Sequence, residues 1–241
     1  MNDRSSLEVG SGIRIGTDTW RFGDAAPHFD EHIAQSVPKC QEQREFIAAL
    51  ARFFLHEGAQ AYEIGVSTGR TAEAVLRRVP GRGVHYTGID LAAEMVALAR
   101  ENLQADPRFS AFCGDAFEFD YRPAALVVSY YTLQFLAPTV REALLAKLWR
   151  SLQPGGAMVM YEKTLGGAAR QQDILAQLYH EFKSQQGLSA AAILNKERAL
   201  QGVAMPLSLE DNQAMLKRVG FTEVEIVFRE HCFAGFLALK D

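Results

Sequence analysis

The stretch from Glu63 to Arg70, Glu-Ile-Gly-Val-Ser-Thr-Gly-Arg, places an acid just before a run of small residues. The apolar residues ahead of it predict a strand, and the pattern after it predicts a helix. Small residues at alternate positions, Gly65, Ser67 and Gly69, let the backbone of the connecting turn pass close to a ligand. The sequence therefore predicts a nucleoside-bearing cofactor at the carboxyl ends of a parallel sheet.

Two further acids follow the next two predicted strands. Asp90 lies twenty-one residues after Gly69, and its carboxylate can accept hydrogen bonds from both ribose hydroxyls, with Leu91 beside it. Asp115, followed by Ala116, can accept a hydrogen bond from the adenine amino group. A lone acid after a strand is most often a helix N-cap. The occurrence of all three features in this order is what predicts a cofactor site.

The charge of Glu63 indicates which cofactor is bound. A dinucleotide fingerprint has three glycines, whereas the string from Gly65 keeps two, and no Lys-Ser/Thr pair follows to form a P-loop. A carboxylate at this turn would repel a pyrophosphate. It suits a ligand that carries ammonium and sulfonium charges and has no phosphate. We therefore predict S-adenosylmethionine (SAM) as the cofactor.

The elements that must position these residues form an alternating pattern. Strands are predicted at 61–64, 84–89, 109–112, 125–129 and 157–161, with helices at 71–78, 93–103 and 140–152. Such alternation predicts an α/β fold, a Rossmann-like, doubly wound and mostly parallel sheet. Two further runs, at 223–228 and 233–239, predict a C-terminal antiparallel hairpin that makes the sheet seven-stranded.

Residues 1–241 are predicted to form a single domain with two additions. Residues 1–60 contain an aromatic cluster of Trp20, Phe22 and Phe29 and a helical pattern at 42–55, which predicts an N-terminal helical cap. Trp20 and Phe22 could cover the cofactor, or pack as core or interface. Residues 166–217 are mostly helical and predict an insertion that forms a lid above the strand ends.

Composition limits the partners. The chain has 241 residues, is 48% hydrophobic and has a net charge of −4, with lysines and arginines scattered singly. These values suit one core and argue against a nucleic-acid partner. We find neither a signal peptide nor an apolar run that could span a membrane. The cysteines, Cys40, Cys113 and Cys232, show neither metal spacing nor a disulfide framework. We expect a cytoplasmic protein with a small-molecule substrate, no membrane or nucleic-acid partner and no metal.

These motifs resemble those of class I SAM-dependent methyltransferases. A closer resemblance covers most of the chain and is to carboxy-S-adenosyl-L-methionine synthase. It is carried by Ser36-Val37-Pro38, Tyr131 to Leu136, Tyr161-Glu162-Lys163, His180 to Lys183 and Leu237 to Lys240. The resemblance implies a methyltransferase fold, a homodimer, and conversion of SAM and prephenate into carboxy-SAM, a donor used in tRNA wobble-uridine modification.

This sequence departs from that family at three positions that the resemblance places in the pocket. The lid arginine that pairs the carboxylate of carboxy-SAM falls at Glu197, with Arg198 one residue later. The family's pocket tyrosine falls at Cys40, and its pocket asparagine falls at Tyr130. Glu197 in place of the family's arginine would put an anion, rather than a cation, next to the carboxylate of carboxy-SAM. Arg198 would restore the cation only by a turn of roughly 100° around the helix. We therefore predict a relative with changed chemistry.

Candidate substrate residues lie at predicted strand ends or in the predicted lid. They are Tyr130, Tyr131, Tyr161, Glu162, Tyr179 and His180. We predict Tyr130, Tyr131, Tyr161 and His180 as catalytic residues, and Tyr179 and Cys40 as substrate contacts. Tyr130 and Tyr131 could also hold the sulfonium by cation–π contact. The alternatives are packing at a strand end for the tyrosines, and an exposed helix position for His180, Glu197 and Arg198.

Three functions fit the sequence. The first, which we predict, is a biosynthetic SAM-dependent methyltransferase acting on an amine, hydroxyl or heterocycle of a small molecule. The second is conversion of SAM itself. It would proceed either by carboxylation with prephenate or by attack of the α-amine on its own γ-carbon, giving methylthioadenosine and a cyclic amino acid of the azetidine-2-carboxylate type. The third, SAM binding without turnover, is disfavoured by the complete motif set.

Overall fold

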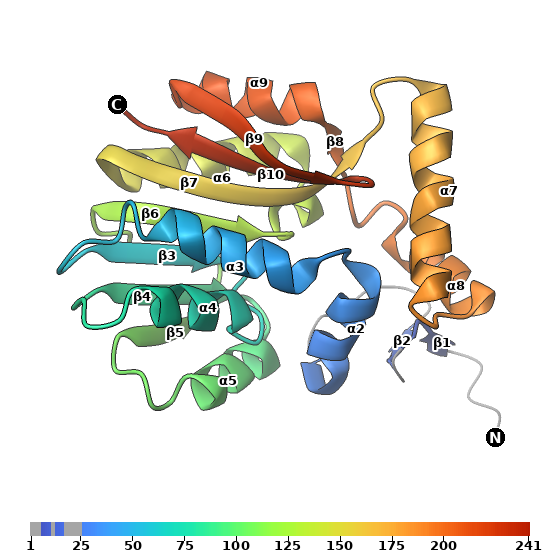
Figure 1. The fold of residues 1–241 in the computed structure, drawn as a ribbon, viewed down its shortest axis with the longest axis horizontal. Coiled ribbons are helices and arrows are strands. Elements are labelled where there is room, and N and C mark those ends of the chain that lie inside the picture. The colour runs from blue at the N-terminus through green and yellow to red at the C-terminus, as the bar shows by residue number, and fades with distance from the viewer. Residues whose placement is uncertain (1–5, 11–12, 17–25) are drawn as a thin grey trace.

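The computed structural model describes residues 6–10, 13–16 and 26–241, and one twisted sheet runs through its middle (Figure 1). Five neighbouring strands are parallel, and two antiparallel strands complete one edge. In sheet order the strands are β5 (Phe109–Cys113), β4 (His85–Asp90), β3 (Gln60–Ile64), β6 (Ala124–Tyr130), β7 (Leu152–Leu165), β10 (Phe233–Leu239) and β9 (Glu223–Glu230). A two-residue strand, β8 (Leu207–Ser208), pairs with the end of β7. The predicted Rossmann-like sheet with its C-terminal hairpin is confirmed.

The central strands are apolar on both faces of the sheet. In β6, Leu126 and Val128 pack into the core on one side, and Val127 packs into the core on the other. Val159 and Met160 of β7 divide between the two cores in the same way. A strand buried on both faces has a continuous apolar sequence, which is why these strands could be predicted from short apolar runs.

Helices cover both faces of the sheet (Figure 1). One face carries α3 (Cys40–Ala51) and α4 (Arg70–Arg78), the other carries α6 (Pro138–Ser151) and α9 (Leu209–Val219), and α5 (Ala93–Asn102) packs beside β5 and β4. Local chemistry fixes where two of these helices begin. Pro138 occupies the first turn of α6, where its missing N–H has no intrahelical partner to lose. The Ser208 hydroxyl caps α9 by accepting from the Asp211 amide at 3.0 Å.

The predicted insertion at 166–217 consists of two different parts. Two helices, α7 (Ala169–Gln185) and α8 (Ala190–Leu200), lie beyond the carboxyl ends of the strands, and α7 stands apart from the sheet (Figure 1). We call them the insertion helices. By contrast, α9 packs against α6 and forms part of a sheet layer. That the insertion helices act as a lid stays a prediction, as does the single-domain division.

The N-terminal region is also divided. A short antiparallel pair, β1 (Ser6–Glu8) and β2 (Arg14–Gly16), was not predicted. After a 3-10 turn, η1 (Ala26–His28), helix α2 (Phe29–Ser36) lies near α8, whereas α3 packs on the sheet. Trp20 and Phe22 fall outside the described residues. Within the described ranges no helix is long and apolar enough to cross a membrane, and a cytoplasmic location stays a prediction.

Candidate functional site

A cavity of about 900 Å³ opens at the carboxyl ends of β3, β4 and β6. The glycine turn after β3 forms its floor, α2 and the insertion helices form its opposite wall, and η2 (Leu133–Phe135) lines its side. This volume is near the upper end of the roughly 300–1,000 Å³ found for small-molecule sites. The cavity can therefore hold a cofactor together with a second group.

The turn that follows β3 has an unusual backbone. Gly65, Ser67 and Gly69 all have positive φ, at 74°, 52° and 82°. Only glycine adopts this region without strain, and a Cβ on Gly65 would lie 2.0 Å from the Thr132 Oγ1. The Ser67 amide donates to Asp90 Oδ2 at 2.9 Å, which stabilises its left-handed conformation. All three residues belong to this turn, and the cavity is lined by Gly65 and Ser67.

Glu63 lies at the carboxyl end of β3 and lines the cavity, with only 1% of its surface exposed. The Tyr86 hydroxyl donates to its Oε2 at 2.9 Å. Burial raises the pKa of the Glu63 carboxyl to about 8, because the charged form loses its hydration. A cationic ligand would supply the missing counter-charge, so Glu63 fits the predicted contact with SAM.

The other predicted cofactor residues gather on the same side of the cavity. Asp90 lines it, and its two carboxylate oxygens each accept one backbone N–H, from Ser67 and from Ala92 at 3.0 Å. Each oxygen keeps a lone pair that a ribose hydroxyl could use. Leu91, which is 72% exposed, Asp115 and Ala116 also line the cavity. Asp115 additionally accepts from the Phe117 amide at 2.8 Å, so it caps the following turn.

Replacement of Asp90 by alanine is expected to weaken SAM binding by about 1.5–3 kcal/mol, because charge-assisted hydrogen bonds to the ribose are lost. Titration calorimetry measures the change. Asp90→Asn, which keeps one acceptor oxygen, is the matched control and should lose less affinity. Equal affinity of the wild type and Asp90→Ala would contradict the ribose assignment.

The tyrosine pair at the end of β6, Tyr130 and Tyr131, lines the cavity as predicted for a pocket. The Tyr131 hydroxyl donates to Gln43 Oε1 at 2.7 Å, and the Tyr130 hydroxyl donates to the Cys40 carbonyl at 3.3 Å. Tyr131 has a φ of 58°, and its ring centre lies 4.5 Å from that of Tyr130. Burial raises the pKa of both phenols, so both stay neutral near pH 7. They are suited to cation–π contact rather than to proton transfer.

Tyr161 and Cys40 do not lie at the cavity surface. Neither is among the described residues that line the cavity. Strand β7 continues to Leu165, so Tyr161 is inside the strand and not at its end. Its ring is fully buried against Gly235, where a Cβ would lie 2.5 Å from Tyr161 Cζ. Glu162 is likewise buried behind η2 and accepts from the Leu133 amide at 3.1 Å. The structure therefore gives Tyr161 and Cys40 no contact with the cavity.

The predicted residues of the insertion do reach the cavity. Tyr179, His180, Glu197 and Arg198 all line it. Glu197 Oε1 is hydrogen-bonded to His180 Nε2 and lies 3.3 Å from Lys183 Nζ. Burial alone would raise the pKa of the Glu197 carboxyl, but the bond to His180 and the charge of Lys183 outweigh it and lower that pKa. Glu197 is therefore an ionised, paired carboxylate that connects α8 to α7.

Three lysines near this end of the cavity were missed in the sequence. Lys163 and Lys196 line the cavity, and Lys183 lies beside them with 2% of its side chain exposed. Lys196 Nζ is hydrogen-bonded to His32 Nε2 at 2.6 Å and donates to Ser36 Oγ at 3.0 Å. Burial lowers the pKa of Lys196 to about 7 and that of His32 to about 3. The three lysines come from β7, α7 and α8, and nothing in their spacing indicates that they meet.

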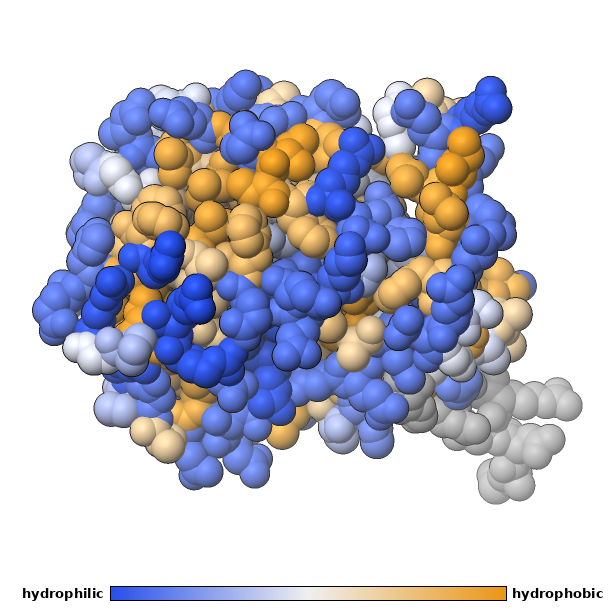
Figure 2. Space-filling model, in the orientation of Figure 1, coloured by the Kyte–Doolittle hydropathy of each residue, from blue (hydrophilic) through white to orange (hydrophobic). Residues whose placement is uncertain are grey.

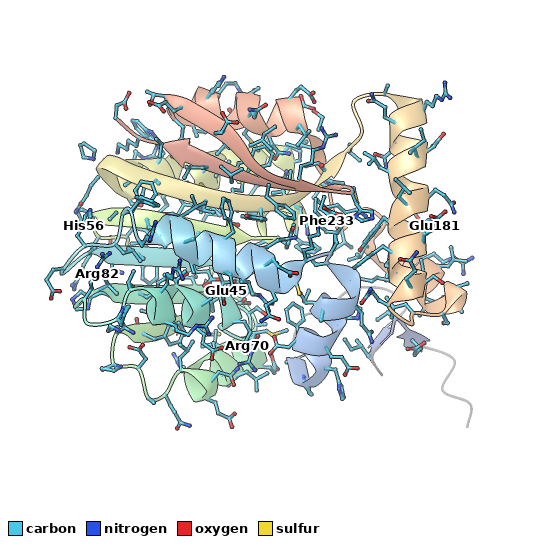
Figure 3. All side chains as sticks on the ribbon, in the orientation of Figure 1. Glu45, His56, Arg70, Arg82, Glu181 and Phe233 are labelled. Atoms are coloured by element: carbon cyan, nitrogen blue, oxygen red, sulfur yellow. The ribbon has the colours of Figure 1, made fainter. Side chains whose placement is uncertain are left out.

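Helix α2 is held against the glycine turn. Figure 3 shows Arg70 on the side of α4 that faces α2, and its Nε donates to Asp30 Oδ2 at 2.7 Å. The Thr68 hydroxyl donates to Asp30 Oδ1 at 2.6 Å. Figure 3 also shows Phe233 at the start of β10 near α7, whereas Glu181 points away from the sheet. Asp30 thus connects α2 to the cofactor side of the cavity.

Sequence comparison identifies relatives along most of the chain. Residues 61–156 match a family model described as a methyltransferase domain. Carboxy-S-adenosyl-L-methionine synthase of Staphylococcus epidermidis is 30% identical over 222 residues, which cover 92% of this chain and 96% of that protein. The enzyme of the same name from Chromohalobacter salexigens is 36% identical over 216 residues, which cover 88% of this chain and 80% of that protein.

Solved structures share the fold at low sequence identity. An O-methyltransferase family protein from Burkholderia thailandensis has a TM-score of 0.65 and 15% identity over 90% of this chain and 60% of that one. Phosphoethanolamine N-methyltransferase 2 of Haemonchus contortus, solved with SAM, has a TM-score of 0.62 and 19% identity over 94% of this chain and 61% of that one. The chain therefore spans about three fifths of these solved chains.

Proposed function

Because the chain belongs to the carboxy-S-adenosyl-L-methionine synthase family, we propose that it is a methyltransferase whose small-molecule acceptor carries a carboxylate. The chain is a SAM-dependent transferase, and the proposal concerns what receives the methyl group. One observation carries it: a single cavity has an acidic end that suits SAM and a lysine-rich end that suits an anion.

The acidic end would hold SAM through Glu63 and Asp90. SAM supplies the methyl group and its own leaving group. The protein's part is to align the acceptor with the methyl–sulfur bond and to exclude water. Tyr130 and Tyr131 would shield and orient the sulfonium with their neutral rings. His180, held by Glu197, is the candidate base if the acceptor atom is protonated.

The lysine-rich end would hold the acceptor. Lys163 Nζ lies 4.9 Å and Lys183 Nζ 4.3 Å from the centre of the Tyr179 ring, so two amines contact one aromatic ring. Glu197 is the carboxylate among the described lining residues at this end, and it is already paired. A carboxylate on the acceptor would balance the remaining positive charge and favour the charged form of Lys196.

Glu197 favours methyl transfer over carboxylation. The resemblance places at this position the arginine that holds the carboxylate of carboxy-SAM. Glu197 offers no N–H donor to a carboxyl group on the methyl carbon, so the bidentate partner of carboxy-SAM is missing, which disfavours carboxy-SAM as product. The uncarboxylated methyl group of SAM needs no such partner.

A second candidate function is favoured by Glu63. It lines the cavity where the α-ammonium of SAM would lie, so it is the carboxylate placed to take a proton from that group. The neutral amine could then displace sulfur from the γ-carbon, giving methylthioadenosine and a four-membered cyclic amino acid. No acceptor is needed for this reaction.

Mass spectrometry of three incubations separates these functions: SAM alone, SAM with prephenate, and SAM with a panel of small carboxylic acids. We expect S-adenosylhomocysteine and a methylated acid in the third incubation only. Methylthioadenosine from SAM alone would establish the second candidate. Carboxy-SAM formed only with prephenate would establish the reaction named for the relatives. Asp90→Ala is the control for chemistry that needs the site.

We also propose that the chain forms a homodimer. Figure 2 shows hydrophobic side chains gathered over the face of β10 and β9 beside α3. They include the half-buried Phe228, Leu237 and Leu239. Light scattering should give twice the chain mass of 26.7 kDa. Leu237→Lys should shift this mass towards the monomer, and a monomeric wild type would refute the proposal.

A further inference from the structure

An arginine that no predicted motif includes, Arg44, faces the acidic end of the cavity. It lies in the second turn of α3, which begins at Cys40 after the left-handed Lys39. Arg44 is half-buried and lines the same cavity as Glu63 and Tyr130. Its Cζ lies 5.6 Å from the centre of the Tyr130 ring, so the ring holds the guanidinium over the cavity.

Apart from its contact with the Tyr130 ring, the Arg44 guanidinium donates no hydrogen bond to the residues that the structure describes. Its Nε is buried without a hydrogen-bond partner among the residues that the structure describes. A guanidinium carries five N–H donors, and buried donors in proteins are normally paired. An arginine that lines a cavity and keeps an unpaired donor therefore points to an acceptor supplied by a ligand.

Glu63 supplies the opposite charge on the same wall. The charge of Arg44 acts on Glu63 and opposes the rise in its pKa, so the two groups lie close enough to interact. Glu63 accepts its hydrogen bond from Tyr86 and not from Arg44. A cation and an anion thus face one space without contacting each other. A zwitterion fits between such groups, and the amino-acid end of SAM is a zwitterion.

We infer that Arg44 binds the α-carboxylate of SAM while Glu63 holds its α-ammonium. The planar fork of arginine matches a carboxylate in a bidentate manner, whereas lysine offers only a point charge. The inference deepens the proposed function and rests on its SAM site. It does not depend on which molecule receives the methyl group.

The test compares SAM with decarboxylated SAM, which keeps the ammonium and the sulfonium but lacks the carboxylate. Calorimetry on the wild type should show SAM binding roughly 10–100-fold more tightly than decarboxylated SAM. In Arg44→Met this ratio should fall to about one, through loss of SAM affinity alone. Arg44→Lys should give an intermediate ratio. Unchanged binding of methylthioadenosine shows that the variants keep the site.

Three outcomes would overturn the inference. They are a wild-type ratio near one, an Arg44→Met ratio equal to that of the wild type, and equal weakening of both ligands. Unchanged SAM affinity with a raised KM for an acidic acceptor would place Arg44 on the acceptor instead. Failure of the proposed methyl transfer is distinguishable, because the binding ratio would then persist without any methylated product.

Discussion

Glu63→Gln is expected to weaken SAM binding by roughly 30-fold or more and, at the same time, to stabilise the folded protein above about pH 6. The loss of binding follows from removal of the carboxylate that faces the ligand's positive charge. Removing one partner of a desolvated charge pair costs about 2–5 kcal/mol. The gain in stability has a different cause, which is the burial of an ionisable group.

The sign of the stability effect follows from the pKa. Burial raises the pKa of Glu63 from 4.5 to about 8, so the folded protein holds this proton more tightly than the unfolded chain does. The free energy of unfolding therefore falls as pH rises between about 4.5 and about 8. Glutamine has no such proton to lose and can still accept from the Tyr86 hydroxyl. The variant should be more stable by about 2–4 kcal/mol near pH 8.

Binding should depend on pH for the same reason. SAM prefers ionised Glu63, so its affinity for the wild type should rise from pH 6 towards pH 8 with release of a proton. Glu63→Gln should show no proton release. Calorimetry in two buffers of different ionisation enthalpy counts the proton, and urea unfolding at pH 6 and pH 8 gives the stability.

Glu63→Ala is the contrasting variant, because it leaves the Tyr86 hydroxyl unpaired and a cavity in its place. It should lose both binding and stability. Burial also raises the pKa of Glu162 to about 8. The pH dependence of the free energy of unfolding of the wild type therefore has contributions from both Glu63 and Glu162. The comparison of Glu63→Gln with the wild type isolates Glu63. If Glu63→Gln and the wild type had the same free energy of unfolding at pH 8, the claim that burial of ionised Glu63 destabilises the fold would be refuted.

Glu197→Arg is expected to destabilise the fold by about 2–4 kcal/mol. The substitution removes the carboxylate that pairs with Lys183 and places a third cation next to Lys183 and Lys196. Breaking a buried ion pair costs about 3–5 kcal/mol, and the partial exposure of Glu197 reduces this figure. Thermal unfolding measures the change. Glu197→Gln, which keeps the hydrogen bonds without adding a cation, should lose less stability.

The double variant Lys183→Met with Glu197→Arg tests the specificity of the site. It removes the repulsion, so it should recover much of the lost stability. With an arginine at position 197, the affinity for carboxy-SAM relative to SAM should rise at least several-fold. A ratio equal to that of the wild type would show that position 197 does not face the transferred group.

The sequence predicted most of the fold because its information is local. The central parallel strands are buried on both faces, so each appears as an apolar run, and helix patterns separate the strands. The turn from Gly65 to Gly69 and the acids Asp90 and Asp115 each follow a strand directly. Parallel strands bring their carboxyl ends to one edge, so a correct strand order places these residues together.

Tyr161 is a residue for which the local sequence pattern did not predict the position within its strand. Strand β7 was predicted to stop at residue 161, but it continues to Leu165. The strand end therefore lies further along the chain, and Lys163, two residues later on the same face, lines the cavity instead. Because the predicted end of this strand was four residues too early, we expected the phenol of Tyr161 at the cavity, where the structure instead has the amine of Lys163.

By itself, then, the sequence determined the cofactor side of this protein, because a strand, its turn and its acid are consecutive in the chain. Tertiary structure alone decided which cations gather around the cavity. Arg44, Lys163, Lys183 and Lys196 come from four elements separated by many residues. Packing of α3, α7 and α8 around the strand ends brings Arg44, Lys163 and Lys196 to one cavity, with Lys183 beside them. Their charges act over a few ångströms in space, a proximity that sequence spacing does not encode.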